Sequence, residues 1–398
     1  MTPAARIATA IEILDAILAG AHAEQALTSW ARRNRFAGSG DRAAIRDHVY
    51  DALRCRRSFA AMGGAEAGAA GTGRQLMIGA LRAADEDPAA AFTGQNYAPA
   101  ALSEAERATL PDLPSHDDLP ELVALDCPDW LEAPLRAALG GDFAEVMSAM
   151  RSRAPVFLRV NLALTDLAAA QAALEAEGIL TEPHPLASTA LEVVGNPQRI
   201  RNSAAYRDGL VELQDAASQA VVEMLPLAAG QRVLDYCAGG GGKTLAMAGR
   251  CKARYYVHDV APQRMRDLPA RAERAGVKTT ILRTTEVAQA APFDLILIDV
   301  PCSGSGTWRR APEAKWTFTP RRLEELVRTQ REILDTVKDH VTVGGHLAYT
   351  TCSLLEEENG AQIRAFLAHD TGWECVNERR LTPLDGGDGF YMALLKRR

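Results

Sequence analysis

The 398-residue chain lacks the features that mark membrane, secreted and zinc-binding proteins. No run approaches the ~20 apolar residues that span a membrane, and the first residues, MTPAARIATAIEIL, form no cleavable signal pattern. The seven cysteines are scattered, with no CxxC pair and no histidine-rich neighbour, which argues against a disulfide framework and a zinc site. We therefore expect a protein that binds no metal and that resides in the reducing cytoplasm.

A positive overall charge is missing as well. The formal charge of −7 gives no global support for nucleic-acid binding, so any such function must depend on local basic patches. The rest of the composition, 47% hydrophobic and 24% charged, is ordinary for a globular protein. The length is enough for two or three domains, each with a core of its own.

Apolar spacing indicates an all-helical region over residues 1–145. In its first segment the apolar side chains recur every three or four positions and form one helix face: Ile7, Ile11, Leu14 and Leu18. A second helix is predicted over 39–59, where a Ser-Gly-Asp cap opens a stretch rich in arginine. Residues 84–120 are acidic and rich in proline, which favours an irregular connector that contains short helices.

Strands and helices alternate in the remaining chain. Residues 146–204 predict a small α/β subdomain, whose first strand lies in FLRVNLALTD. Residues 205–398 alternate short apolar runs with helical stretches, which is typical of a doubly wound sheet. The strands that we expect there are RVLDYC (232–237), RYYVHD (254–259), TTILR (279–283), FDLILID (293–299), GHLAYTT (345–351) and GFYMALLK (389–396).

A glycine-rich turn joins a strand to a helix over residues 232–248. Glycines let the backbone approach a ligand closely, and a helix N-terminus offers unpaired N–H groups. A P-loop is disfavoured because Cys237 occupies the position of its first glycine. A dinucleotide-binding motif is disfavoured because Thr244 stands where its last glycine belongs. Asp259, after the second strand, suits the ribose of S-adenosylmethionine or of NAD, so the turn alone leaves both cofactors open.

Two cysteines follow buried strands, Cys302 after 293–299 and Cys352 after 345–351. Open α/β sheets keep their sites at the carboxyl ends of their strands. C5 of a pyrimidine becomes nucleophilic enough to accept a methyl group when a thiolate adds to C6, and release then requires loss of the C5 proton and of the thiol. Asp299 and the two cysteines meet these needs, which favours methyl transfer over hydride transfer.

The residues around Cys302 fit this chemistry. Pro301 restricts the backbone before it, and we expect Gly304 and Gly306 to leave room for a flat ring. Four other cysteines are interpreted as ordinary core residues: Cys55, Cys127, Cys251 and Cys375.

Four segments closely resemble the motif series of the RNA cytosine-5 methyltransferases of the Nop2/Sun group. They are DYCAGGGGKT, IDVPCSGSGTWRRAPEAKW, YTTCSLLEEENG and DGFYMALLKRR, and the resemblance covers residues 150–398. Residues 1–80, above all GDRAAIRDHVYDALR, resemble the NusB-like RNA-binding domain of the bacterial 16S ribosomal RNA enzymes in this family. The resemblance implies a helical NusB-like domain, a small RRM-like α/β subdomain and a Rossmann-like methyltransferase domain.

The resemblance also implies a role for each site residue. Cys352, in the Thr-Cys motif, is the nucleophile, and Cys302, in the Pro-Cys motif, aids product release. Asp299 bonds the base, and Lys243 faces the active site. The residues implied to bind S-adenosylmethionine are Cys237, Ala238, Gly239, Gly240, Gly241, Gly242, Lys243, Asp259, Arg264, Glu286 and Asp299.

Two positions depart from the family's pattern. Gly240 stands where the cofactor loop usually has proline. After the third strand the family often has an acid for the adenine, and here LRTTEVAQ offers Thr284, Thr285 and Glu286. We expect Glu286 to take the place of that acid.

Basic residues predict where RNA is bound. Arginine and lysine flank the Pro-Cys motif and are interleaved with tryptophan, a mixture suited to phosphates and bases: Arg309, Arg310, Lys315, Trp308 and Trp316. In the helical region, Arg42 and Arg46 are further candidates, with a solvated helix surface as the alternative.

Together these features predict a monomeric, cytoplasmic S-adenosylmethionine-dependent RNA cytosine-5 methyltransferase that acts on small-subunit ribosomal RNA. A base must leave its stack to react, so the target cytosine is expected in a single strand or a loop. No membrane or DNA partner is expected. Two alternatives stay open: the same chemistry on transfer RNA, and an RNA-binding assembly factor that has the fold but no turnover.

Overall fold

The computed structural model describes all residues, 1–398, and divides into two compact units. The first unit contains Met1–Arg153 and Trp308–Thr317, and the second contains Ala154–Thr307 and Phe318–Arg398. None of the helices combines the length and the apolar character that crossing a bilayer requires.

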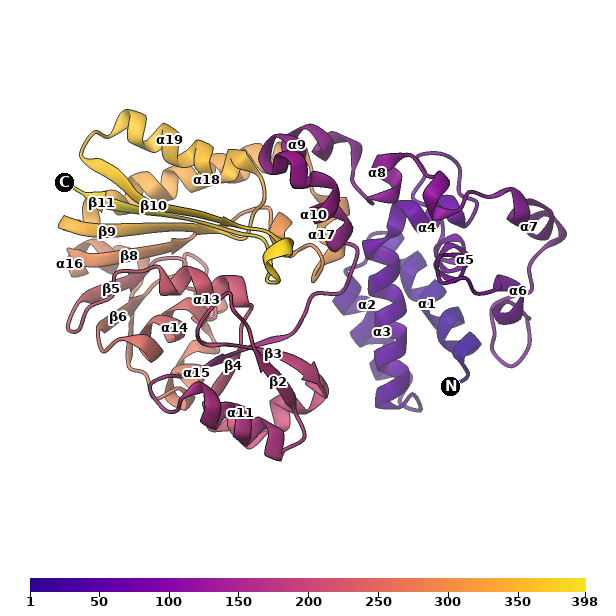
Figure 1. Ribbon diagram of the computed structural model, residues 1–398, viewed down its shortest axis with the longest axis horizontal. Helices are drawn as coiled ribbons and strands as arrows, with labels where there is room; N and C mark the ends of the chain where they lie inside the picture. The colour runs from indigo at the N-terminus through magenta and orange to yellow at the C-terminus, as the bar shows by residue number, and fades with distance from the viewer. The chain divides into compact units, whose positions relative to one another are not determined.

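The first unit consists of helices joined by turns (Figure 1). Its apolar core is built mainly from α1, α3 and α5, with Leu14, Ile45 and Leu76 fully buried. Helix α3 ends at Arg54, and α4 begins at Arg56, so the helix predicted over 39–59 is interrupted at Cys55. The helices are α1 (Pro3–Leu18), α2 (Ala23–Arg33), α3 (Ser39–Arg54), α4 (Arg56–Met62), α5 (Gly73–Ala83), α6 (Pro88–Ala91), α7 (Glu104–Thr109), α8 (Glu121–Ala124), α9 (Glu132–Leu139), α10 (Phe143–Ala149) and α17 (Pro312–Thr317).

The segment Trp308–Thr317 belongs to this helical unit although it follows the Pro-Cys motif in the sequence. Trp316 Nε1 donates to the Leu53 carbonyl at 2.7 Å, and Lys315 Nζ donates to the Arg54 carbonyl at 3.2 Å. Arg54 in turn donates from Nε to the carbonyl of Arg309 at 2.7 Å. These bonds tie the segment to the end of α3, and no local sequence pattern predicts them.

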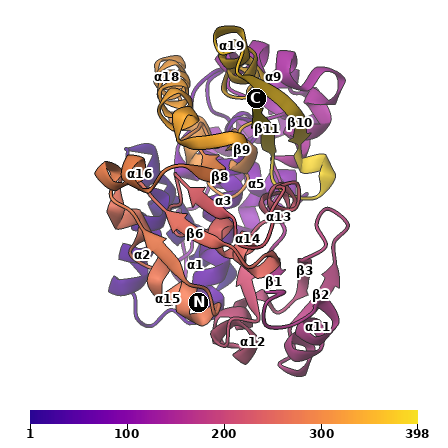
Figure 2. The same cartoon turned by 90° about the vertical axis from the view of Figure 1, so that its left-hand side faces the viewer.

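The second unit contains a small four-stranded sheet of strand order β2-β3-β1-β4, whose pairs are all antiparallel. Its core is built around Leu158, Leu174 and Leu191. Because β4 pairs with β1, this sheet extends beyond the predicted boundary at residue 204. Its elements are β1 (Phe157–Val160), α11 (Leu167–Ala176), β2 (Leu180–Pro183), β3 (Ala190–Gly195), α12 (Ala204–Arg207) and β4 (Val211–Leu213), which gather beside one another in Figure 2.

The same unit contains a seven-stranded sheet of order β10-β11-β9-β8-β5-β6-β7. Strands β5 to β9 run parallel, and β11 pairs antiparallel with both β9 and β10. All six predicted strands are confirmed, and the structure adds β10. The strands are β5 (Arg232–Asp235), β6 (Arg254–Val257), β7 (Thr279–Ile281), β8 (Phe293–Asp299), β9 (Val341–Thr351), β10 (Trp373–Leu381) and β11 (Phe390–Arg397).

Helices cover both faces of this sheet, which explains the unbroken apolar run of β8. Leu295 and Leu297 face α13 and α14, whereas Ile296 and Ile298 face the opposite layer with α18 and α19 (Figure 1). The helices are α13 (Ala216–Glu223), α14 (Gly242–Arg250), α15 (Leu268–Arg274), α16 (Thr284–Ala290), α18 (Pro320–Val337) and α19 (Gly360–His369). The carboxyl ends of β5, β6, β8 and β9 therefore meet at one edge, where the candidate site lies.

Candidate active site

The glycine-rich turn between β5 and α14 adopts a conformation that requires glycine. Gly239 and Gly241 have φ angles of +51° and +77°, in the left-handed region. A Cβ on Gly241 would lie 2.1 Å from Leu268 Cδ1 of α15. The turn therefore brings bare backbone to the N-terminus of α14, where a ligand can approach closely.

Asp259, at the end of β6, holds this turn. Its Oδ2 accepts a hydrogen bond from the Gly239 N–H at 3.0 Å and lies 3.1 Å from Nη1 of Arg264. Its Oδ1 accepts from the Ala261 N–H at 2.9 Å. Asp259 and Arg264, both predicted to bind the cofactor, thus lie at the glycine-rich turn. The contact of Asp259 with a ribose stays a prediction.

Two buried residues beneath the turn were missed by the sequence analysis. Asp235 accepts a hydrogen bond from the Thr244 hydroxyl at 2.6 Å on Oδ2, while its buried Oδ1 has no hydrogen-bond partner. Burial raises the pKa of Asp235 to about 6. Arg159 of β1 donates to the Gly242 carbonyl at 2.8 Å, so the small sheet supports the loop. An isolated acid and an isolated arginine carry no sequence signal that would single them out.

Glu286 lies at the first turn of α16. Its Oε2 accepts from the Arg283 N–H at 2.8 Å, and its Oε1 pairs with the Arg283 guanidinium at 2.6 Å. A contact of Glu286 with the cofactor stays a prediction. His258 also lies at this end of the sheet, with Nε2 2.9 Å from the hydroxyl of Thr284.

Lys243 and Asp299 form an ion pair at the carboxyl ends of β5 and β8. Lys243 Nζ lies 2.5 Å from Asp299 Oδ2 and 4.8 Å from the centre of the Phe390 ring. Burial by itself would lower the pKa of Lys243, but the charge of Asp299 and its hydrogen bond outweigh that effect and raise it. Lys243 therefore stays protonated, and a third of the Asp299 side chain (33%) remains exposed.

The two strand-end cysteines face each other, with 3.4 Å between Cys302 Sγ and Cys352 Sγ. The hydrogen bond to Cys352 and, next, burial raise the pKa of Cys302 well above its ordinary value. Cys302 therefore keeps its proton, and either sulfur can be the donor in the contact between them. A negative charge on Cys352 would interact favourably with the ammonium of Lys243.

A buried carboxylate joins the two cysteine loops. Glu358 has no exposed surface, and it accepts from the Ser303 N–H at 2.8 Å and from Gln330 Nε2 at 3.0 Å. It also accepts from the hydroxyls of Ser303 and Ser353, each at 2.5 Å. Ser303 follows Cys302 and Ser353 follows Cys352, so Glu358 sets the distance between the two sulfur atoms. This network was not predicted, because Glu358 meets Ser303 only when segments 55 positions apart in the chain pack together.

Glu358→Gln is expected to lower the free energy of unfolding by about 3 kcal/mol. One amide oxygen cannot accept from all the donors around it, and the new NH₂ group would face the serine hydroxyls. Glu324→Gln on the exposed face of α18 is the matched control, because Glu324 makes no hydrogen bond or ion pair. Denaturant unfolding followed by circular dichroism measures the difference. An equal, small effect of both substitutions would show that the network does not stabilise the two loops.

Gly306 serves a different purpose from the one predicted. A Cβ there would lie 2.1 Å from the Gly389 carbonyl oxygen, and the Gly306 N–H donates to the Cys352 carbonyl at 2.9 Å. The prediction that Gly306 leaves room for a substrate ring is wrong, because neighbouring backbone fills that space. The missing side chain instead lets the Pro-Cys loop pack against the segment before β11.

The residues predicted to bind RNA divide into two groups. Lys315 and Arg309 are buried (2% and 5% exposed), so the prediction that they bind phosphates is wrong. Burial lowers the pKa of Lys315, whose ammonium lies within the helical unit. Arg310, Arg42 and Arg46 are exposed, and their RNA contacts stay predictions.

The remaining cysteines also differ from one another. Cys55 and Cys127 are buried as predicted, and burial raises their pKa values to about 12 and about 11. Cys251 is partly buried. Cys375 is exposed on the outermost strand β10, so its interpretation as a core residue is wrong.

Comparisons with known proteins agree with this fold and site. Residues 222–396 match the family model "16S rRNA methyltransferase RsmB/F", and residues 127–199 match the ferredoxin-like domain of the same proteins. The ribosomal RNA small subunit methyltransferases B of Salmonella arizonae and Escherichia coli K12 are 34% and 33% identical over 282 residues. The match covers 67% of this chain and 66% of each relative, so the chain spans about two thirds of their length.

Solved structures share the fold. The crystal structure of PH0851 has a TM-score of 0.76 and 23% identity, and the match covers 100% of this chain and 99% of that one. NSun6 from Pyrococcus horikoshii, solved with SFG, has a TM-score of 0.60 and 17% identity over 68% of this chain and 98% of that one. The matched family is one of S-adenosylmethionine-dependent methyltransferases. This chain, with both of the family's matched domains, belongs to the RsmB/F methyltransferases.

Proposed function

We propose that the protein transfers a methyl group from S-adenosylmethionine to C5 of a cytosine in RNA, through a transient bond between Cys352 and C6. The substrate that family membership favours is the 16S ribosomal RNA, in the cytoplasm. One observation carries the chemistry: two thiols 3.4 Å apart, one protonated and the other beside the Lys243 ammonium.

The residues around the glycine turn fit the cofactor. The bare backbone at Gly239 to Gly242 and the N-terminus of α14 would receive its carboxylate end. The unpaired Oδ1 of Asp235 offers an acceptor for a donor of the bound cofactor, and Asp259 lies where the ribose would sit. When bound, the cofactor supplies an electrophilic methyl group. Cys237 and Ala238 belong to the same loop, and Arg264 lies against it.

The chain's own residues perform the remaining steps. The Cys352 thiolate adds to C6 of the cytosine, which makes C5 nucleophilic. Asp299, held by Lys243 and by the Thr350 hydroxyl (3.2 Å), would accept a hydrogen bond from the exocyclic amino group beside N3 of the cytosine. After methyl transfer the C5 proton passes to a solvent water, the electrons of the C5–H bond restore the C5–C6 double bond, and the Cys352–C6 bond breaks with its electron pair leaving on sulfur. Cys302, hydrogen-bonded to Cys352, is the group beside that bond that assists its release.

Ribosomal RNA whose cytosines carry tritium at C5 tests the proposal, because methylation at C5 releases that tritium to water. The expected result is time-dependent release that requires S-adenosylmethionine, and bisulfite sequencing then locates the modified cytosine. Transfer RNA labelled in the same way tests the alternative substrate. Methyl incorporation without tritium release would place the methyl group elsewhere on the RNA. No incorporation into either RNA would favour an RNA-binding factor without turnover.

A further inference from the structure

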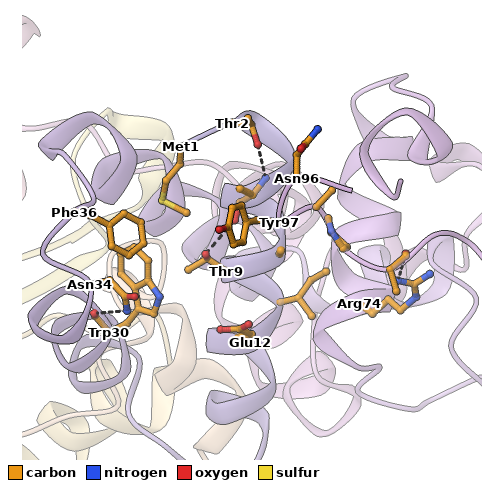
Figure 3. A pocket seen from close by; sticks show the side chains of 16 residues that line it. Met1, Thr2, Thr9, Glu12, Trp30, Asn34, Phe36, Arg74, Asn96 and Tyr97 are labelled. Atoms are coloured by element: carbon orange, nitrogen blue, oxygen red, sulfur yellow. Dashed lines mark hydrogen bonds between the residues drawn. The ribbon is translucent and has the colours of Figure 1, made fainter. Parts of the chain in front are cut away.

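The helical unit contains a cavity of about 990 Å³ that the proposed chemistry does not use. It lies between the first half of α1, the end of α2 and the segment 96–100 (Figure 3). In this view Phe36 and Trp30 lie together on one side, and Tyr97 stands beside Thr9 of α1. We call this cavity the aromatic pocket.

Two aromatic rings of the aromatic pocket are unusually exposed. Phe36 is 75% exposed and Tyr97 is 91% exposed, and no other aromatic residue is among the exposed large apolar side chains. Tyr97 also has a φ angle of +66°, a conformation that costs energy for a bulky residue. Both rings thus remain in water at a cost to the fold, which is typical of surfaces that bind a partner.

The polar groups of the pocket suit a flat, hydrogen-bonding ring. The Asn34 amide donates to the Trp30 carbonyl at 2.9 Å, which leaves the Asn34 side-chain oxygen as an acceptor. The side chain of Asn96 has no partner within the chain and offers both a donor and an acceptor. Glu12, exposed on the wall, adds a carboxylate that accepts from amino groups and repels phosphates. The interior is therefore suited to a nucleobase and not to a phosphate.

Positive charge lies directly outside the pocket. Arg32, Arg33 and Arg35 are exposed next to Phe36, and none of them forms an ion pair with a carboxylate. A protein ligand with an apolar segment would need no such cluster. Aromatic faces for bases beside arginines for phosphates are the combination found in proteins that bind single-stranded RNA.

We propose that the aromatic pocket binds an unstacked base of the RNA substrate, with the neighbouring phosphates on Arg32, Arg33 and Arg35. This inference rests on the proposed function only in taking RNA as the substrate. The pocket would select RNAs that present a bulged or single-stranded nucleotide in addition to the target cytosine. It belongs to the helical unit, whereas the catalytic cysteines belong to the other unit.

Fluorescence anisotropy with the full chain and a labelled single-stranded RNA of about 16 nucleotides tests this inference. Phe36→Ala/Tyr97→Ala is expected to raise the dissociation constant at least about fivefold, because a stacked base contributes ~1–3 kcal/mol. Val343→Ala is the control, since Val343 is equally exposed (73%) but lies at the start of β9. Circular dichroism melting is expected to be unchanged in both variants, because the replaced side chains are exposed.

Two further variants separate the contribution of aromatic stacking to RNA binding from that of the arginine charges. Phe36→Leu/Tyr97→Leu keeps apolar surface without aromatic faces and is expected to bind as weakly as the alanine variant. Replacing the three arginines with glutamine is expected to reduce the salt dependence of binding by ~0.7 in log–log slope for each phosphate that the protein no longer neutralises.

Unchanged RNA affinity of the alanine variant would overturn the inference, and so would normal RNA binding by the leucine variant, which would show that no base stacks on the two rings. Binding is measured without S-adenosylmethionine, so these outcomes do not depend on whether methyl transfer occurs. The tritium-release assay decides the proposed function separately.

Discussion

Cys352→Ala is expected to lower the rate of methyl transfer by at least about a thousandfold. Without a sulfur bound to C6, the C5 carbon of cytosine has too little electron density to attack a methyl sulfonium. Cys302 is not expected to take over, because its raised pKa keeps it protonated. The structure therefore predicts that the whole loss appears in the chemical step.

The measurement is tritium release under single-turnover conditions, with enzyme in excess over RNA. Cys375→Ala on the exposed strand β10 is the matched control and is expected to react at the wild-type rate. RNA binding by Cys352→Ala, followed by anisotropy, shows whether the variant still forms the complex. Retained transfer by Cys352→Ala would show that the covalent mechanism is wrong for this chain.

Cys302→Ala is expected to have the opposite signature and to accumulate a covalent RNA–protein complex. Attack by Cys352 and methyl transfer do not need the second thiol, whereas release needs a group beside the Cys352–C6 bond. The only other sulfur at that position is that of Cys302, 3.4 Å away. Turnover should therefore stop after about one methyl group per enzyme, with the product still attached.

Denaturing gel electrophoresis with labelled RNA detects this complex, since a covalent adduct survives boiling in detergent. The double variant Cys302→Ala/Cys352→Ala is the control and is expected to form none. An adduct that appears in Cys352→Ala and is absent from Cys302→Ala would exchange the roles of the two cysteines. Comparing the melting temperatures excludes unfolding, because removal of a small buried thiol is expected to cost only about 1 kcal/mol.

Strand periodicity predicted most of the large sheet, because β8 and β9 are apolar on both faces and are bounded by glycine and acidic residues. Strand β10 escaped prediction because it is an edge strand. Its sequence WECVNERRL has exposed polar residues through its middle, and its pairing with β11 alone makes it a strand. The positions of the two cysteines were predictable as well, because each cysteine follows the apolar run of one of these two strands.

The placement of Trp308–Thr317 shows where such reasoning fails. Arg309 and Lys315 stand beside a catalytic motif and look like RNA contacts in the sequence. Lys315 Nζ donates to the carbonyl of Arg54, 261 positions earlier in the chain, and the backbone carbonyl of Arg309 accepts from Arg54 Nε. Both side chains are buried. Local composition contains no information about a partner at that separation.

The amino-acid sequence by itself determined the parallel sheet, the glycine turn and the location of two thiols at strand ends, because these follow from short-range periodicity and backbone preference. The tertiary structure alone decided the 3.4 Å between the sulfur atoms, the buried Glu358 that holds their loops together, and the burial of Arg309 and Lys315. Each of these depends on which side chains meet when distant segments pack. That choice is made by burial and by the need to pair every buried polar group, and it is settled only in the folded chain.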